Sequence, residues 1–182
     1  MRSYFTTPIF LLLKSIIVQI STLFLISLIL FSCTKEEEVF KTSSDKIGVL
    51  IDTTSVTCTS IETEILDLVN EHRKSLGMQT LKPLTIISAV AESHTKYMIE
   101  TGEVNHDDFY LREQALVSEA GAKSVAENVA YGYVSASNAV NAWLQSESHR
   151  NIIENPNFTH FGISIDTNTE GRNYFTQMFI KK

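Results

Sequence analysis

The sequence of 182 residues contains only two cysteines, Cys33 and Cys58. Two cysteines cannot supply the set of disulfides that holds many small secreted domains together. Stability must therefore come from the packing of apolar side chains, for which about 120 residues are enough.

Basic residues are scarce as well. Fifteen lysines and arginines stand against 21 acidic residues, so the formal net charge is −6. A surface that binds nucleic acid needs clustered positive charge, and the sequence has no basic stripe of that kind. The composition therefore argues against nucleic acid as a partner. No internal repeat is evident.

The first 32 residues differ in composition from the rest. They carry only two charges, both positive, and Ser15 to Ser32 is uncharged and mostly apolar. This run ends at Leu30-Phe31-Ser32-Cys33, which resembles a lipobox, although Phe31 is larger than the residue usual there. We therefore expect residues 1–32 to be a lipoprotein signal peptide and Cys33 to carry the lipid. The alternative is a plain transmembrane anchor, since about 18 uncharged residues can span a bilayer.

Residues 33–58 are rich in Thr, Ser, Lys and Glu, which predicts a flexible tether. The apolar patch Ile47-Gly-Val-Leu-Ile51 within it is a candidate for docking as an edge segment. Lys35-Glu-Glu-Glu38 resembles the acidic sorting signal of surface-exposed lipoproteins in some Gram-negative bacteria; the alternative is a solvated linker. We expect an exported protein, lipid-anchored in the cell envelope at the outer membrane or cell surface.

Helical signals dominate the first part of the domain, which we place at residues 59–182. Thr59-Ser-Ile-Glu62 is a capping-box pattern, and the apolar spacing that follows predicts a helix ending near Gly77. Further helices are predicted from near Pro83 to Gly102, over 109–118 and over 135–147, with 121–133 as a mixed segment.

The C-terminal part has the alternating pattern of strands. Phe161 to Ile165 and Tyr174 to Ile180 are predicted strands, joined by a turn at Asn168 to Gly171. Helices followed by a hairpin indicate an α+β fold, with a small antiparallel sheet covered by helices.

Several short motifs in this domain occur together in one known family. They are His106, Ala126-Glu-Asn128, Trp143 followed by Ser146-Glu-Ser-His-Arg150, Asn155-Pro-Asn-Phe158, and Asn173-Tyr-Phe-Thr-Gln-Met-Phe179. The combination resembles the CAP superfamily (cysteine-rich secretory proteins, antigen 5 and pathogenesis-related 1), most closely its compact bacterial members. The resemblance covers roughly residues 60–182 and implies an α-β-α sandwich with the sheet between helical layers.

The same resemblance implies a site. Animal CAP proteins have two His and two Glu that line a cleft and can hold zinc, and His106 and Glu127 match one of each. The second Glu position holds Ser146, with Glu147 next to it, and the second His position holds Tyr174. One helical turn further, His149 is a candidate replacement. The candidate ligand-binding residues are therefore His106, Glu127, His149, Glu147 and Tyr174.

Zinc is the one candidate cofactor. His106 and His149 would be two ligands, and Glu127 or Glu147 a third, because a zinc site needs three or four such ligands. No local motif such as His-Glu-x-x-His supports the site. The alternative is a hydrogen-bonded network of His106, Glu127 and His149 that fixes loops over the sheet.

The remaining histidines and aromatic residues have structural interpretations. His72 and His94 lie on apolar helix faces and are expected to pack, and Arg73 is expected to bind a carboxylate or carbonyl groups. The expected core aromatic residues are Trp143, Phe158, Phe161, Tyr174 and Phe179. Their alternative role is to line a site for a lipid-like ligand.

Three functions remain open. Nucleophilic catalysis is poorly supported, since Ser148 and His149 are neighbours on a helix and do not face each other. The favoured hypothesis is a non-catalytic, membrane-tethered module that binds a small apolar ligand, a peptide or a surface partner. The alternative is a metal- or His/Glu-assisted hydrolase of the peptidase kind, with Glu127 as general base. The third is an envelope structural protein without pocket chemistry.

Overall fold

The computed structural model describes Thr53 and residues 58–182. The predicted signal peptide, the predicted lipidation site at Cys33 and most of the tether lie outside the described residues. Within the described part, none of the helices has the length and apolar character needed to cross a membrane.

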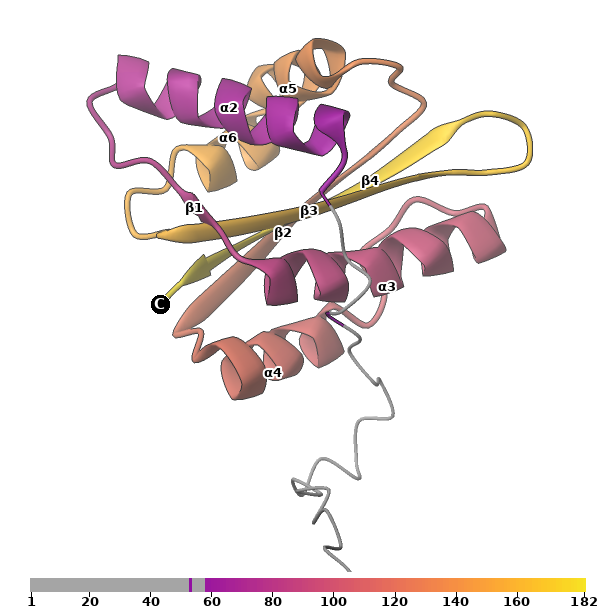
Figure 1. The fold of residues 1–182 in the computed structure, drawn as a ribbon, viewed down its shortest axis with the longest axis horizontal. Coiled ribbons are helices and arrows are strands. Elements are labelled where there is room, and N and C mark those ends of the chain that lie inside the picture. The colour runs from indigo at the N-terminus through magenta and orange to yellow at the C-terminus, as the bar shows by residue number, and fades with distance from the viewer. Residues whose placement is uncertain (1–52, 54–57) are drawn as a thin grey trace, which may run out of the picture. The chain divides into compact units, whose positions relative to one another are not determined.

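Strands are interspersed with helices along the described chain, which ends in the hairpin of two strands (Figure 1). The helices are α2 (Ser60–Ser75), α3 (Thr85–Thr101), α4 (Phe109–Ala120), α5 (Ala136–Gln145) and α6 (Glu147–Ile153). The strands are β1 (Lys82–Pro83), β2 (Ser124–Tyr131), β3 (His160–Thr167) and β4 (Asn173–Lys181).

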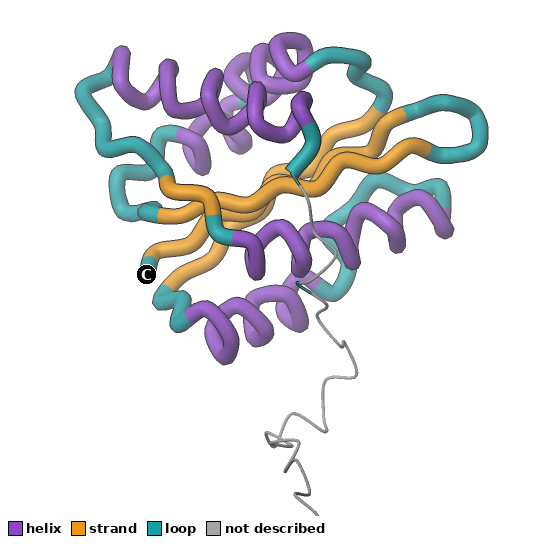
Figure 2. The backbone as a smooth tube through the Cα atoms, in the orientation of Figure 1, coloured by secondary structure: helices purple, strands orange, loops and turns teal. Residues whose placement is uncertain are grey.

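The four strands form one sheet in the order β1-β3-β4-β2. β3, β4 and β2 are antiparallel neighbours, and the short β1 pairs with β3 in parallel. Helices α2, α5 and α6 cover one face of the sheet, and α3 and α4 cover the other (Figure 2). The expected α+β fold, an α-β-α sandwich, is confirmed.

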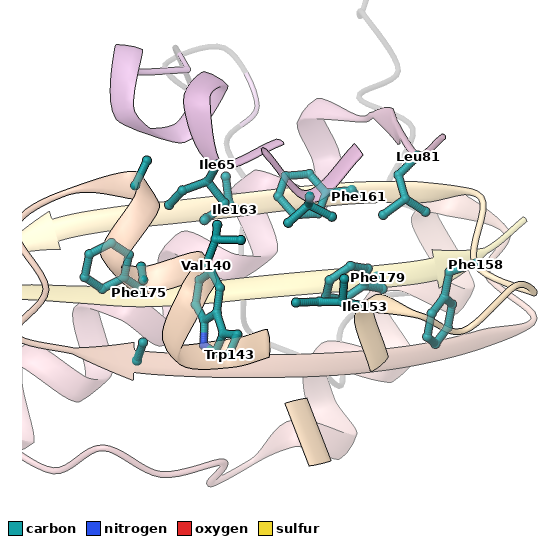
Figure 3. Close-up of a cluster of buried hydrophobic side chains, with 14 residues drawn as sticks. Ile65, Leu81, Val140, Trp143, Ile153, Phe158, Phe161, Ile163, Phe175 and Phe179 are labelled. Atoms are coloured by element: carbon teal, nitrogen blue, oxygen red, sulfur yellow. The ribbon is translucent and has the colours of Figure 1, made fainter. Parts of the chain in front are cut away.

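Each face of the sheet has its own apolar core. Figure 3 shows the larger one, in which Trp143 and Val140 of α5 and Ile65 of α2 pack over Phe175 and Phe179 of β4. The smaller core lies between the sheet and the helices α3 and α4. The five aromatic residues predicted for the core are all buried. Among the described residues, both cores and all four strands of the sheet fall within residues 59–182.

One glycine lets a helix approach the sheet closely. A Cβ added to Gly162 would lie 2.5 Å from the backbone nitrogen of Ser88 and 2.6 Å from two atoms of Ile87. Only glycine therefore allows α3 to lie at this distance from β3.

Three local predictions need correction. The mixed segment 121–133 contains the edge strand β2, and the predicted helix 135–147 ends earlier, because the extended backbone of Ser146 (ψ 119°) separates α5 from α6. Pro83 belongs to β1, and α3 begins two residues later. Pro83 sits at the sheet margin, where its missing N–H costs no ladder hydrogen bond.

Candidate functional site

The candidate site is built on β2. Successive side chains of a strand point to opposite faces, so Glu127 faces α3 and α4 whereas Asn128 faces α6. The side chain of Glu127 is only 1% exposed. A carboxylate buried this deeply needs partners for its charge.

Two residues from other elements hold this carboxylate. Arg112 of α4 donates from Nε to Oε2 at 2.6 Å and from Nη2 to Oε1 at 2.8 Å, a bidentate ion pair. His106, on the loop between α3 and α4, contacts Oε1 through Nδ1 at 2.8 Å. The predicted proximity of His106 and Glu127 is therefore a direct contact.

These partners decide the protonation state of Glu127. Burial acts to raise the pKa of the carboxyl, but the hydrogen bonds from His106 and Arg112 outweigh it and hold the pKa below 4.5. The group is ionised at neutral pH, so Nδ1 of His106 is the donor in their hydrogen bond. Nε2 of His106 has no protein partner among the described residues, and the side chain is 51% exposed.

His94 of α3 lies behind this contact. Its Nε2 is 2.8 Å from the carbonyl oxygen of Asn105 and 3.9 Å from Oε1 of Glu127. Burial lowers the pKa of His94, so the imidazole is neutral at pH 7 and Nε2 donates to the carbonyl. The residue packs as expected, and it also adjoins the carboxylate.

The loop that carries His106 is fixed by its neighbours. The side chain of Asn105 accepts from the amide of Asp107 at 3.0 Å, and the hydroxyl of Tyr97 donates to the Asp107 carboxylate at 3.0 Å. Nη1 of Arg112 donates to the Asp107 carbonyl at 2.7 Å. Arg112 thus holds the loop and the carboxylate together, and presents His106 in one orientation.

The main chain of His149 lies on the other side of β2. The side-chain amide of Asn128 donates to the His149 carbonyl at 3.3 Å, which ties α6 to the strand. Burial, and then the charge of His106, lower the pKa of His149.

The other two candidates lie apart from this cluster. Glu147 is exposed in the first turn of α6 and forms no ion pair among the described residues. Tyr174 is 3% exposed and packs on Tyr131, with 4.7 Å between ring centroids.

Zinc does not fit the arrangement. In the part of the chain that the structure describes, no three His, Cys, Asp or Glu side chains are grouped so as to hold a metal ion. The cause is visible at Glu127, because both of its oxygens accept from Arg112 and one also from Nδ1 of His106. The guanidinium of Arg112, a residue that the sequence analysis did not include, supplies the positive charge that a metal ion would otherwise bring to Glu127.

One signal in the sequence points to Arg112. Phe109, Leu116 and Ala120 form the apolar stripe of α4, and Arg112 occupies a position of that stripe. A charged residue on the buried face of a helix needs a buried partner of opposite charge. The pattern indicates such a partner without identifying Glu127.

The pKa of His149 gives a direct check on this geometry. We expect His106→Ala to raise it, because the change removes a like charge and leaves the burial of His149 in place. Proton NMR of the imidazole Cε1–H in residues 59–182 measures the titration. His72→Ala is the control, because it removes a different imidazole, one that contacts Glu154 at 2.9 Å and not Glu127.

An unchanged pKa of His149 in the His106 variant would separate the two imidazoles and remove His149 from the site. The sign for stability also follows. The folded pKa lies below 6.5, so the unfolded chain binds the proton first as the pH falls. As the pH falls from 6.5 through the folded pKa of His149, the free energy of unfolding therefore decreases, and it stays lower at more acidic pH.

Comparison with known proteins identifies the family. The family model described as "CAP: Cysteine-rich secretory protein family" matches residues 66–179. The chain belongs to the CAP superfamily. This CAP protein is 34% identical over 145 residues to the uncharacterized membrane protein YlbC of Bacillus subtilis, covering 78% of this chain and 39% of YlbC. It is 31% identical over 124 residues to the uncharacterized protein YkwD of the same species, covering 66% and 47%.

The chain thus spans less than half the length of these two curated relatives. Solved structures show the same fold. An outer surface protein of Borrelia burgdorferi has a TM-score of 0.62 at 21% identity, covering 70% of this chain and 96% of that one. An extracellular SCP-domain protein of Bacillus anthracis has a TM-score of 0.60 at 28% identity, covering 66% and 40%. The chain is a CAP protein of the bacterial type.

Proposed function

We propose that this CAP domain is exported, tethered to the cell envelope, and binds a peptide or another surface component at His106 and His149 without cleaving it. The lipobox-like sequence at Cys33 supports the tether. The relatives and structural neighbours include proteins named as membrane, outer surface and extracellular proteins, which agrees with export.

The state of Glu127 carries the proposal. A general base needs a free lone pair and a pKa near the working pH. Both oxygens of Glu127 accept strong hydrogen bonds, and its pKa is held below the ordinary value. Glu127 therefore acts as a clamp that orients His106, and the exposed imidazole is the group available to a ligand.

A peptide or surface component fits better than an apolar small molecule. Trp143, Phe161 and Tyr174, which would line an apolar site, are packed in the interior at 3% exposure or less. The groups that adjoin solvent at the site are polar: the half-exposed His106 and the partly buried His149.

A hydrolase is the second candidate, for one specific reason. A buried carboxylate bonded to Nδ1, with Nε2 free, is the orienting half of a nucleophilic triad. The missing part is the nucleophile, since no hydroxyl or thiol among the described residues hydrogen-bonds to His106. Ser146 and Ser148 bond to each other at 3.2 Å.

The anchor is tested separately from the site. Cys33→Ser in the full chain should abolish incorporation of a labelled fatty acid and release the protein from the membrane fraction. Labelling that persists in this variant would refute lipidation at Cys33.

The binding function is tested with residues 59–182 against two probes, a phage-displayed library of random decapeptides and a soluble fragment library followed by NMR. We expect ligands whose affinity falls at least about tenfold in His106→Ala and in His149→Ala. His72→Ala is the matched control and should bind normally. Mass spectrometry should recover the bound peptides intact.

Two results would contradict the proposal. Cleavage of a bound peptide that stops in His106→Ala would establish the hydrolase instead. Ligands whose affinity is the same in both site variants would place binding elsewhere on the domain.

A further inference from the structure

The sheet of this protein has two edges, and one of them is closed by side chains. The outward amides of β3 are satisfied in turn: Ile163 donates to the hydroxyl of Ser88 at 3.2 Å, and Ile165 to the carboxylate of Glu62 at 2.9 Å. The first part of β3 is covered by β1. Proteins block edge strands in this way because a free edge pairs with other chains.

At the opposite edge, β2, a side chain of the described residues bonds to one outward main-chain group only. The main-chain N–H and C=O groups of the even-numbered residues of β2 point toward β4. The amide of Gly132, which continues the register of β2 with β4, shows this by donating to the carbonyl of Asn173 at 2.8 Å. The odd-numbered residues therefore point their N–H and C=O groups outward: Val125, Glu127, Val129 and Tyr131. Among the described residues, only one of these groups has a partner, the Val129 carbonyl, which accepts from Trp143 Nε1 at 3.1 Å.

This open edge coincides with the candidate site. Glu127 is buried, at 5% exposure, and its outward main-chain groups lie beside the contact of its side chain with His106. The side chain of His106 approaches β2 from the face covered by α4, and the main chain of His149 lies on the face covered by α6. A strand laid against β2 would run beside Glu127, whose side chain holds His106.

One end of the edge is positively charged. Lys123 directly precedes β2, its amide donates to the carbonyl of Lys181 at 2.8 Å, and Lys182 follows β4. All three lysines are exposed, in a chain whose net charge is −6. An extended peptide that pairs antiparallel with β2 has its C-terminal end beside these lysines.

We propose that the β2 edge binds an extended peptide by strand addition, with acidic side chains or a terminal carboxylate of the peptide against Lys123, Lys181 and Lys182. The proposal rests on the binding function given above and specifies its ligand. The outward N–H and C=O groups of β2 supply affinity, and His106 and His149 contact the side chains of the peptide.

The test scans the backbone of decapeptides selected on residues 59–182 from the random library. Each peptide position is N-methylated in turn, which removes one N–H. Strand addition requires a period of two: alternate positions lose at least about tenfold in affinity and the positions between them lose little. The selected sequences should be acidic toward the C-terminus. A flat scan, a neutral or basic C-terminal end, or a library that yields no binder overturns the proposal.

A variant of the protein gives an independent check. Val129→Pro removes an outward N–H and no bond of the ladder with β4, a substitution that edge strands accept. It should weaken the selected peptides about tenfold, whereas Val129→Ala, which keeps the N–H, should leave them nearly unchanged. Circular dichroism melting shows whether each variant is folded, and the N-methyl scan decides the question if Val129→Pro is not.

Binding at His106 and His149 and strand addition at β2 can be refuted separately. Peptides that lose affinity in His106→Ala but give a flat N-methyl scan would leave the binding site in place and refute strand addition. Peptides that show the period of two but bind His106→Ala and His149→Ala with unchanged affinity would support strand addition and refute binding at the two histidines.

Discussion

Glu127→Gln should lower the free energy of unfolding by about 3–5 kcal/mol, the usual cost of removing one partner of a buried ion pair. The amide is neutral, and it leaves the guanidinium of Arg112, 7% exposed, without a counter-charge. Its NH₂ group also faces the donors of Arg112 and His106 where an oxygen accepted both. Urea denaturation at pH 7 of residues 59–182 measures the effect.

The matched control is Glu92→Gln on α3. Glu92 pairs with Lys96 one helical turn away, and both side chains are far more exposed than those of the buried pair. Such a surface pair contributes about 0–1 kcal/mol. The double variant Glu127→Met with Arg112→Met should cost less than Glu127→Gln alone, since no unpaired charge is left. A loss below about 1 kcal/mol in Glu127→Gln would show that the ion pair does not hold the site together.

Arg73→Met should cost about 3 kcal/mol or more, by the loss of several hydrogen bonds to a charged group. Arg73 is 0% exposed, and its guanidinium donates to four main-chain carbonyls, which confirms the structural role expected for it. The carbonyls belong to Gln79, Ile153, Asn155 and Phe158. Three of these four follow or end α6, so the change also loosens the helix that carries His149.

Two further variants test this assignment by the same urea measurement. Arg73→Lys should recover only part of the loss, because one ammonium group cannot reproduce a planar fork of donors. Lys74→Met, at the exposed neighbouring position, should stay within about 0.5 kcal/mol of the parent. Full recovery by lysine would mean that the charge matters and the fork geometry does not.

Local signals explain which parts of the fold were predictable. The capping box at Thr59 is confirmed: Glu62 accepts from the Thr59 amide at 2.7 Å and donates its own amide to the Thr59 hydroxyl at 3.3 Å. The hairpin of β3 and β4 was equally clear. β2 was not, because Glu127 and Asn128 place buried polar groups on both of its faces and interrupt the alternation that marks a strand.

The site depends on contacts that local patterns cannot show. His106 and Glu127 are 21 residues apart, and Arg112 and Glu127 are 15 apart. Only the CAP resemblance predicts that His106 and Glu127 lie close together. The resemblance implies zinc as one possibility and does not include Arg112, whose guanidinium donates to both oxygens of Glu127.

Carbon-13 NMR of the Glu127 side-chain carboxyl, followed while the pH is lowered, tests the account most directly. The account predicts a pKa below 4.5, with the stabilisation by the ion pair complete above that pH and lost as the pH falls through the folded value. A pKa at or above 4.5 would show that the hydrogen bonds from His106 and Arg112 do not favour the charged form, and would contradict the role of Glu127 as the group that orients His106.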